Sequence, residues 1–226
     1  MKNVVITGTS RGIGFELAQL FANNNFNVLA LSRNAKTLEA INHKNITTLA
    51  IDLTKKQSLT SVNDFIKNNW KQVDILINNA GTLLNKEFET TTTEDFINVY
   101  NVNVFAVASL TQTLLPYFVK NTHVVTISSM GGIQGSMKFS GLAAYSSSKG
   151  AVITLSELLA EEYREKGYKF NVLAIGAVQT EMLAEAFPDY KAPLQPTEIA
   201  SYIYDFSTTG YKFYNGKVLQ VSSTTP

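Results

Sequence analysis

Seven short runs of aliphatic and β-branched residues recur along the chain, and none of them alternates regularly with polar residues. Strands of this composition are typical of a parallel sheet that is buried on both faces. The pattern therefore predicts strands at residues 3–7, 27–31, 46–51, 75–78, 123–128, 169–175 and 217–221.

Longer segments with a helical pattern lie between these runs. They cover residues 12–24, 35–42, 55–68, 93–120, 144–166 and 197–206. Strands that alternate with helices in this way predict an α/β fold: a Rossmann-type doubly wound parallel sheet of about seven strands, with helices on both faces. No repeat, low-complexity tract or Pro/Gly-rich linker divides residues 1–226, so we expect a single domain.

The segment 176–196 fits neither pattern. It follows the sixth expected strand, contains Pro188, Pro193 and Pro196, and mixes aromatic with aliphatic residues. Irregular segments of this length are more often functional than idle, and ligands of open α/β sheets bind beyond the carboxyl ends of the strands. We therefore expect a substrate lid here, and a plain surface excursion is the alternative.

Composition argues against several classes of function. The net charge of +1 gives no electrostatic basis for binding nucleic acid or an anionic membrane. Cysteine is absent, and the two histidines, His43 and His123, form no metal-binding pair, so we expect no metal. No apolar stretch approaches the ~18 residues of a membrane span, and the N-terminus does not resemble a signal peptide. A cytoplasmic protein is expected.

A glycine-rich turn joins the first expected strand to the first expected helix. Glycines permit a tight turn and a close approach of the backbone to a pyrophosphate, and a helix N-terminus favours anions. The G-x-x-x-G-x-G spacing differs from the G-x-G-x-x-G fingerprint, so structural glycines without a ligand are the alternative. The turn residues expected to contact a cofactor are Gly8, Ser10, Arg11, Gly12, Ile13 and Gly14.

The end of the second expected strand indicates which dinucleotide is bound. NAD sites commonly place a carboxylate there, on the 2′-hydroxyl of the adenosine ribose. This chain has Ser32 and Arg33 instead, and it contains only three arginines. Arg33 and Arg11 are suited to charge-assisted hydrogen bonds with a 2′-phosphate, so NADP(H) is favoured over NAD(H). Arg33 as a solvated loop residue is the alternative.

Tyr145 and Lys149 are four residues apart, so on a helix they share one face. A cation held there lowers the pKa of a phenol toward the working pH, which makes Tyr145 a usable proton donor or acceptor. Composition alone produces roughly 0.7 such pairs in a chain like this one. The pair therefore gains its weight from its companions, and Ser128 and Ser129 precede it.

Together these motifs resemble the short-chain dehydrogenase/reductase family, and the resemblance covers essentially the whole chain. Six motifs occur in the family's order. The resemblance implies that the catalytic residues are Asn103, Ser129, Tyr145 and Lys149. It implies cofactor contacts, beyond the glycine turn, from Ser32, Arg33, Asp52, Leu53, Asn79, Ala80, Gly81, Tyr145, Lys149, Gly176, Val178 and Thr180.

Several of these residues also have a purely structural explanation. Asp52 is suited to capping the following turn or helix, and Asn79 to forming a turn. For Asn103, the alternative is a polar helix residue that bonds a backbone carbonyl. Ser128 competes with Ser129 for the catalytic position, and the family's register favours Ser129.

The chemistry that the resemblance implies is reversible hydride transfer between nicotinamide and a carbonyl or alcohol carbon. Tyr145 would exchange a proton with the substrate oxygen, and Ser129 would hydrogen-bond the same oxygen. Lys149 would lower the Tyr145 pKa and bind the nicotinamide ribose. Asn103 would anchor a water that connects Lys149 to solvent.

Three features depart from the family's pattern. Ile175 precedes Gly176 where proline is common. Ser129 and Tyr145 are 16 residues apart, which predicts an enlarged loop at 130–142. The tail at 221–224 lacks the expected glycines, so we expect a homodimer formed by the helices at 93–120 and 144–166, and a tetramer is left open.

The substrate is expected to be a small carbonyl or alcohol compound, with a 3-oxoacyl thioester as one option. The candidate contacts are Phe139, Leu142, Met182, Leu183, Phe187 and Tyr190. A catalytically silent nucleotide-sensing or interaction protein on the same fold is the first alternative. The second is an epimerase or dehydratase of sugar nucleotides, which needs a larger C-terminal region than the chain offers.

Overall fold

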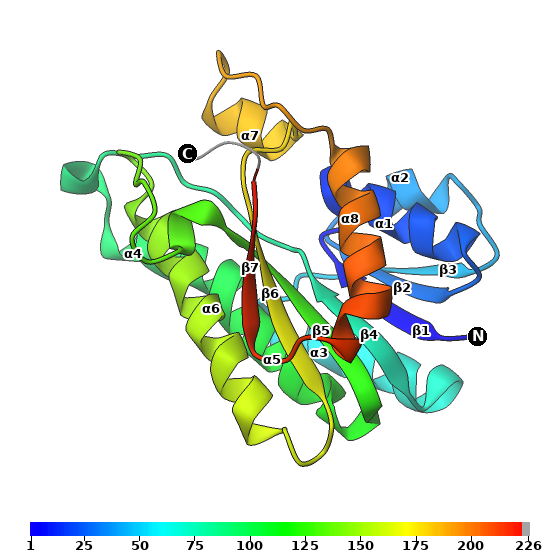
Figure 1. The fold of residues 1–226 in the computed structure, drawn as a ribbon. Coiled ribbons are helices and arrows are strands. Elements are labelled where there is room, and N and C mark those ends of the chain that lie inside the picture. The colour runs from blue at the N-terminus through cyan, green and yellow to red at the C-terminus, as the bar shows by residue number, and fades with distance from the viewer. Residues whose placement is uncertain (223–226) are drawn as a thin grey trace.

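A seven-stranded sheet, in which all neighbouring strands run parallel, forms the centre of the computed structural model (Figure 1). The structure describes residues 1–222. The strand order is β3-β2-β1-β4-β5-β6-β7, which confirms the predicted doubly wound Rossmann-type sheet. The strands are β1 Asn3–Thr7, β2 Asn27–Ser32, β3 Ile46–Ala50, β4 Val73–Asn78, β5 Phe118–Ser129, β6 Lys169–Ile175 and β7 Lys217–Val221.

Helices cover both faces of the sheet (Figure 1). The α-helices are α1 Gly12–Asn23, α2 Lys36–Glu39, α3 Lys56–Phe65, α4 Thr93–Tyr100, α5 Ala106–Leu114, α6 Ala143–Glu162, α7 Glu181–Ala186 and α8 Pro196–Thr209. The short helical turns are η1 Ile66–Trp70, η2 Phe88–Thr90, η3 Asn101–Phe105, η4 Leu115–Tyr117, η5 Met130–Gly132 and η6 Gly210–Lys212; η1 and η3 are π-helical and the others are 3₁₀.

The absence of polar alternation in the strands follows from burial on both faces. In β1, Val4 and Ile6 pack into the core under α1 and α8, whereas Val5 packs into the core under α3 and α5. All five residues of β1 are buried. Because successive side chains of a strand point to opposite faces, both sets must be apolar.

The strand order places a topological switch point between β1 and β4. The chain leaves β1 toward β2 and β3 and then returns to β4 on the other side of β1. Ligands of open α/β sheets bind outside the carboxyl ends of the strands at such a point. The glycine turn after β1 and the sequence Asn78-Asn79-Ala80-Gly81 (N-N-A-G), which begins at the last residue of β4, both lie at this edge.

The prediction of one helix across residues 93–120 is wrong. Instead, α4, the π-helical turn η3, α5 and the 3₁₀ turn η4 follow one another, and β5 begins at Phe118. Pro116 lies in η4, and proline removes a backbone donor and disfavours helix in the residue before it. Phe118 pairs with Val73, so β5 is 12 residues long and extends beyond the predicted run 123–128.

Four other expectations need correction or stay open. The predicted helix 35–42 is reduced to the single turn α2, and the segment 55–68 divides into α3 and the π-helical turn η1. The segment 176–196 is not wholly irregular, because it contains α7. Residues 223 and 224 of the tail lie outside the described residues.

No helix within residues 1–222 is long and apolar enough to cross a membrane. The same part of the chain contains no group of three or more histidine, cysteine, aspartate or glutamate side chains arranged to hold a metal ion.

A buried polar cluster lies at the amino-terminal part of the sheet, away from the switch point. His123 has no exposed surface; its Nδ1 bonds the backbone oxygen of Ser207 at 3.0 Å, and Asn171 Nδ2 donates to its Nε2 at 3.0 Å. Since a carbonyl only accepts, Nδ1 carries the proton and the ring is neutral. Burial lowers the His123 pKa from 6.5 to about 4.

We predict that acid destabilises the fold through His123. The folded-state pKa lies below the unfolded value, so this contribution is complete above pH 6.5 and is lost as the pH falls toward 4. The loss amounts to about 3 kcal/mol of unfolding free energy. Urea unfolding between pH 7 and 4, with proton NMR of the two histidine rings, measures it. Titration of both rings near 6.5 would contradict the prediction.

Candidate active site

The turn after β1 has a backbone that only glycine accommodates well. Gly8 has φ +74° and Gly12 has φ +57°, both in the left-handed region. A methyl group on Gly14 would collide with the carbonyl oxygen of Gly8. Arg11 occupies the N-cap of α1, and neither a side-chain cap nor an acidic residue serves the first turn of this helix. The N–H groups there fit the phosphates of a dinucleotide.

Thr7 and Asn79 lock the ends of β1 and β4 together. Thr7 Oγ1 accepts hydrogen bonds from the backbone N–H groups of Asn79 and Ala80, at 3.0 and 2.9 Å. Asn79 Nδ2 donates in return to the backbone oxygen of Thr7 at 2.9 Å and to that of Gly8 at 3.3 Å. Asn79 therefore braces the glycine turn, which is more than the turn-forming role considered for it.

Asn103 lies in the π-helical turn η3 and is almost completely buried. Its Oδ1 accepts from Thr82 N at 2.8 Å, and its Nδ2 donates to Thr82 O at 3.0 Å and to Ser148 Oγ at 2.9 Å. The side chain thus joins the segment after β4 to α6. π-Helical turns are frequent at functional sites, and this one turns Asn103 toward α6.

Tyr145 and Lys149 occupy one face of α6, as predicted, and Ser129 faces them from the end of β5. The Ser129 side chain lies close enough to the Tyr145 hydroxyl to lower its pKa. Lys149 Nζ donates to the backbone oxygen of Ile127 at 2.9 Å and lies 5.8 Å from the centre of the Tyr145 ring. Ser128 points elsewhere, because its hydroxyl donates to the backbone oxygen of Lys149 at 2.8 Å.

The electrostatics of this pair differ from the expectation. Burial raises the Tyr145 pKa above 10.0, and the nearby Ser129 side chain opposes that rise in part. Burial also lowers the Lys149 pKa from 10.5 to about 8. The groups that shift the Tyr145 pKa here are the surrounding apolar atoms and Ser129, while the Lys149 ammonium group donates to Ile127 O.

A cavity of about 990 Å³ follows the carboxyl edge of the sheet and brings nearly all the predicted residues together. Ser129, Tyr145 and Lys149 line it, and so do all six substrate candidates. Among the predicted residues, only Gly14 and Asn103 do not line it. The predicted cofactor residues on its wall are Gly8, Ser10, Arg11, Gly12, Ile13, Ser32, Arg33, Asp52, Leu53, Asn79, Ala80, Gly81, Gly176, Val178 and Thr180.

Asp52 serves the local backbone as well as the cavity wall. Its carboxylate accepts hydrogen bonds from Thr54 N at 3.0 Å and Thr54 Oγ1 at 2.8 Å. These two bonds, more than the nearby cations Lys55 and Arg33, hold the Asp52 pKa below its usual value. The structural alternative therefore describes a real contact of Asp52, and the residue also lines the cavity.

The segment 176–196 forms a closed loop over the cavity. Val178 pairs with Leu194 in an isolated bridge, so the two ends of the loop meet. Thr180 Oγ1 accepts a hydrogen bond from Leu183 N and so caps α7. Figure 1 shows α7 above the carboxyl edge of the sheet, beside the end of β6.

Two contacts that the sequence did not reveal hold α7 from opposite sides. Arg11 forms a bidentate ion pair with Glu185, with nitrogen-oxygen distances of 2.5 and 3.1 Å. From the opposite wall, Asn85 Nδ2 donates to the backbone oxygen of Ala186 at 3.0 Å. Neither Glu185 nor Asn85 belongs to a sequence motif, so nothing in the chain indicated these contacts in advance. Arg11, expected to hold a phosphate, is engaged by a carboxylate.

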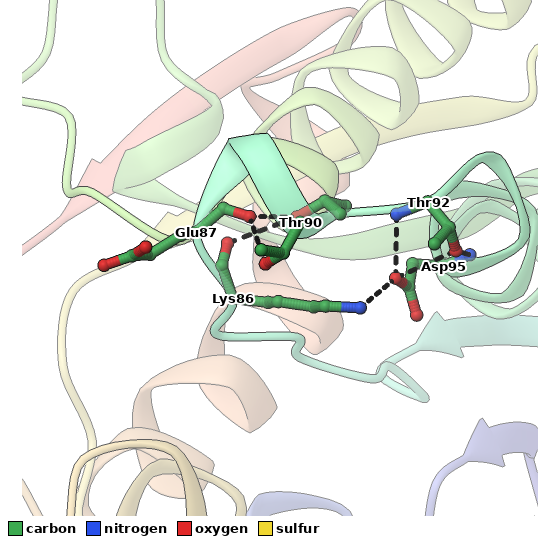
Figure 2. Close-up of polar contacts among 6 residues, drawn as sticks. Lys86, Glu87, Thr90, Thr92 and Asp95 are labelled. Carbon is green, nitrogen blue, oxygen red and sulfur yellow. Dashed lines mark hydrogen bonds and ion pairs between the residues drawn. The ribbon is translucent and has the colours of Figure 1, made fainter.

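The wall that carries Asn85 is fixed by a group of polar contacts at the start of α4 (Figure 2). Lys86 forms an ion pair with Asp95 at 2.7 Å, and Asp95 and Thr92 form a reciprocal capping box. The hydrogen bond to Lys86 is the main cause that lowers the Asp95 pKa to about 2. Lys86 N also donates to Gly141 O at 2.9 Å, which connects this wall to the loop before α6. The capping box was visible in the sequence as Thr-x-x-Asp.

The sequence model of the family described as short chain dehydrogenase matches residues 2–191. A 3-oxoacyl-[acyl-carrier-protein] reductase from Buchnera aphidicola is 32% identical over 187 residues, which are 80% of this chain and 75% of that protein. The corresponding reductase from Chlamydia trachomatis is 27% identical and aligns with 97% of this chain and 95% of its own length.

Solved structures share the fold along nearly the whole chain. ElxO with NADP bound superimposes with a TM-score of 0.85 at 28% identity, covering 98% of this chain and 97% of its own. A 3-ketoacyl-(acyl-carrier-protein) reductase from Brucella melitensis complexed with NADH gives a TM-score of 0.89 at 24% identity, covering 98% of this chain and 96% of its own. The latter likeness concerns the fold alone.

We predict that Asn103→Ala lowers the unfolding free energy by about 1–3 kcal/mol, because the buried partners on Thr82 and Ser148 lose their hydrogen bonds. Asn101→Ala is the matched control, since Asn101 lies in the same turn and is only partly buried. Urea unfolding of both variants measures the difference. Equal losses of unfolding free energy in the two variants would show that the Asn103 hydrogen bonds do not stabilise the fold as described.

Proposed function

Because the chain belongs to the short chain dehydrogenase family of NAD(P)-dependent oxidoreductases, we propose that it is an NADP(H)-dependent carbonyl reductase or alcohol dehydrogenase in which Tyr145 is the general acid and base. Its substrate is a small molecule with a C=O or CH–OH group. The observation that carries the proposal is that Ser129, Tyr145 and Lys149 line one cavity, which begins at the glycine turn.

The bound nicotinamide supplies or accepts the hydride, and the protein supplies the proton. In reduction, Tyr145 gives its phenolic proton to the substrate oxygen. The raised Tyr145 pKa supports this direction, because the phenol stays protonated at neutral pH. Ser129 lies beside the Tyr145 hydroxyl on the cavity wall, so a substrate oxygen placed between them would receive hydrogen bonds from both.

Lys149 and Asn103 support the site in different ways. A methyl group placed on Gly81 would lie 3.5 Å from Lys149 Nζ and 3.4 Å from Asn103 Oδ1. Both groups therefore border Gly81, next to the expected position of the nicotinamide ribose. We assign Lys149 to the ribose hydroxyls and Asn103 to the position of the water that reprotonates Lys149.

The preference for NADP(H) rests on Arg33 and Arg11, which line the cavity where β2 ends and α1 begins. Ser32 Oγ donates to the backbone oxygen of Asn34 at 2.9 Å and shapes this turn. No carboxylate follows β2 before Asn34 to select a 2′-hydroxyl. ElxO, 28% identical, is solved with NADP bound.

The substrate end of the cavity is mainly apolar, which favours an aldehyde or ketone with an apolar body. Met137 and Pro193 line the cavity in addition to the six predicted substrate contacts. Lys191 also lines it and adds a cation that was not predicted from the sequence. The reductases from Buchnera and Chlamydia are named for 3-oxoacyl thioesters, so this class heads the list of candidate substrates. Residues 176–196 are the lid over it.

The alternative of a catalytically silent protein gains no support, because Ser129, Tyr145 and Lys149 are all present and meet in one cavity. Exposed apolar side chains on α4, η3 and α6, namely Ile97, Phe105 and Leu158, favour a homodimer through these elements. The cytoplasmic location expected from the sequence stays a proposal.

Tyr145→Phe is expected to lower turnover by about 10²–10⁴-fold, the usual contribution of a general acid, while the affinity for NADPH stays nearly unchanged. NADPH absorbance with a panel of carbonyl compounds measures turnover, and calorimetric titration measures affinity. A tyrosine-to-phenylalanine variant of ElxO has been solved with NADPH bound, so such a change is compatible with binding in that protein. A turnover rate like that of the wild type in Tyr145→Phe would refute the role of Tyr145 as general acid.

Arg33→Ala is expected to weaken NADPH binding by about tenfold or more, since a charge-assisted hydrogen bond to the 2′-phosphate is lost. NADH binding should hardly change. Arg164→Ala is the matched control, because Arg164 is exposed and pairs with Glu161. Calorimetric titration with both dinucleotides decides the matter. Tighter binding of NADH than NADPH by the wild type would refute the preference.

A further inference from the structure

Two carboxylates of the lid helix face the glycine turn. Glu181 and Glu185 are one turn apart on α7 and so share a face of the helix. Glu185 holds Arg11 through both guanidinium nitrogens. Glu181 lies against the turn itself, because its Oε2 would be 3.5 Å from a methyl group placed on Gly12.

The place these carboxylates occupy is the anion-binding end of α1. Arg11 is the N-cap of that helix, and no acidic residue of α1 lies in its first turn. The bond with Glu185 is the main cause that raises the Arg11 pKa, and the charges of Glu185 and Glu181 add to it. The acidic face of α7 thus supplies the negative charge that the phosphates of a dinucleotide would otherwise supply there.

We propose that Glu185 is a cofactor-specificity residue, which competes with the 2′-phosphate of NADP(H) for Arg11. The proposal rests on the proposed function, since it concerns the same cofactor. An arginine fork fits one carboxylate or one phosphate in bidentate fashion, so Arg11 cannot serve both at full strength. Like charges also repel, and a phosphate beside Glu181 and Glu185 would drive α7 away from the turn.

The competition acts more strongly on NADPH than on NADH. Only NADPH carries the 2′-phosphate, and its affinity is reduced by the fraction of molecules in which Glu185 holds Arg11. Moving α7 would also break the bond from Asn85 to Ala186 on the opposite wall. The lid and the nucleotide end of the cavity are therefore linked through one side chain.

Calorimetric titration of the Glu185→Gln variant tests the proposal. The neutral amide releases Arg11, so we expect NADPH to bind about two- to fivefold more tightly, the factor set by the strength of an exposed ion pair. NADH should gain less. Glu165→Gln is the matched control: it removes the same charge from an exposed position just beyond the end of α6, and it should leave both affinities unchanged.

A double-mutant cycle identifies the partner. In an Arg11→Gln background, Glu185→Gln should have no effect on NADPH affinity, because the contested side chain is gone. Unchanged or weaker NADPH binding in the single Glu185→Gln variant would overturn the proposal, as would an equal gain for NADH. So would a Glu185→Gln gain that persists without Arg11.

The same titrations separate this proposal from the proposed function. They measure binding and do not depend on turnover, so they are repeated in the Tyr145→Phe background, with the same gain expected. An enzyme that binds NADPH as described but reduces no carbonyl compound would refute the catalytic proposal and leave the competition standing. A wild-type protein that binds neither dinucleotide would overturn both.

Discussion

The structure depends on the hydrogen bonds that hold the ends of β1 and β4 together. Thr7 Oγ1 accepts two backbone N–H groups of the N-N-A-G segment, and Asn79 returns two bonds to the backbone of Thr7 and Gly8. Polar groups are required there because the chain leaves the sheet after both strands. Its backbone N–H and C=O groups then need hydrogen-bond partners other than a neighbouring strand. The same bonds fix the glycine turn against the segment that leads to Asn103.

The catalytic side extends from that interlock through buried polar contacts. Gly81 follows the interlock and borders both Asn103 and Lys149. Asn103 reaches α6 through Ser148, and α6 carries Tyr145. Burial then sets the chemistry, since it keeps the Tyr145 phenol protonated and makes the charge on Lys149 easier to remove. One series of contacts thus fixes the position of the glycine turn relative to Tyr145, the proposed proton donor.

The sequence predicted what depends on local pattern and missed what depends on packing between distant segments. Strands β1 and β6 match their predicted limits, because burial on both faces leaves a plain apolar run. The edge strand β7 also matches its predicted limits, although its side chains are only partly buried. The helix predicted over residues 93–120 ends in the 3₁₀ turn at Pro116, and Phe118 then pairs with Val73. No local pattern indicates that strand pairing. The Arg11–Glu185 pair spans 174 residues and became visible only when the lid was folded over the turn.

The central claim is that the edge of the sheet between the glycine turn and Tyr145 is one dinucleotide site, with the acidic lid helix at its nucleotide end. A crystal structure of the NADPH complex tests it most directly. We expect the pyrophosphate at the N-terminus of α1 and the nicotinamide beside Tyr145. We also expect Arg11 to bind the 2′-phosphate, with Glu185 displaced. Electron density for the dinucleotide elsewhere on the molecule would contradict the claim.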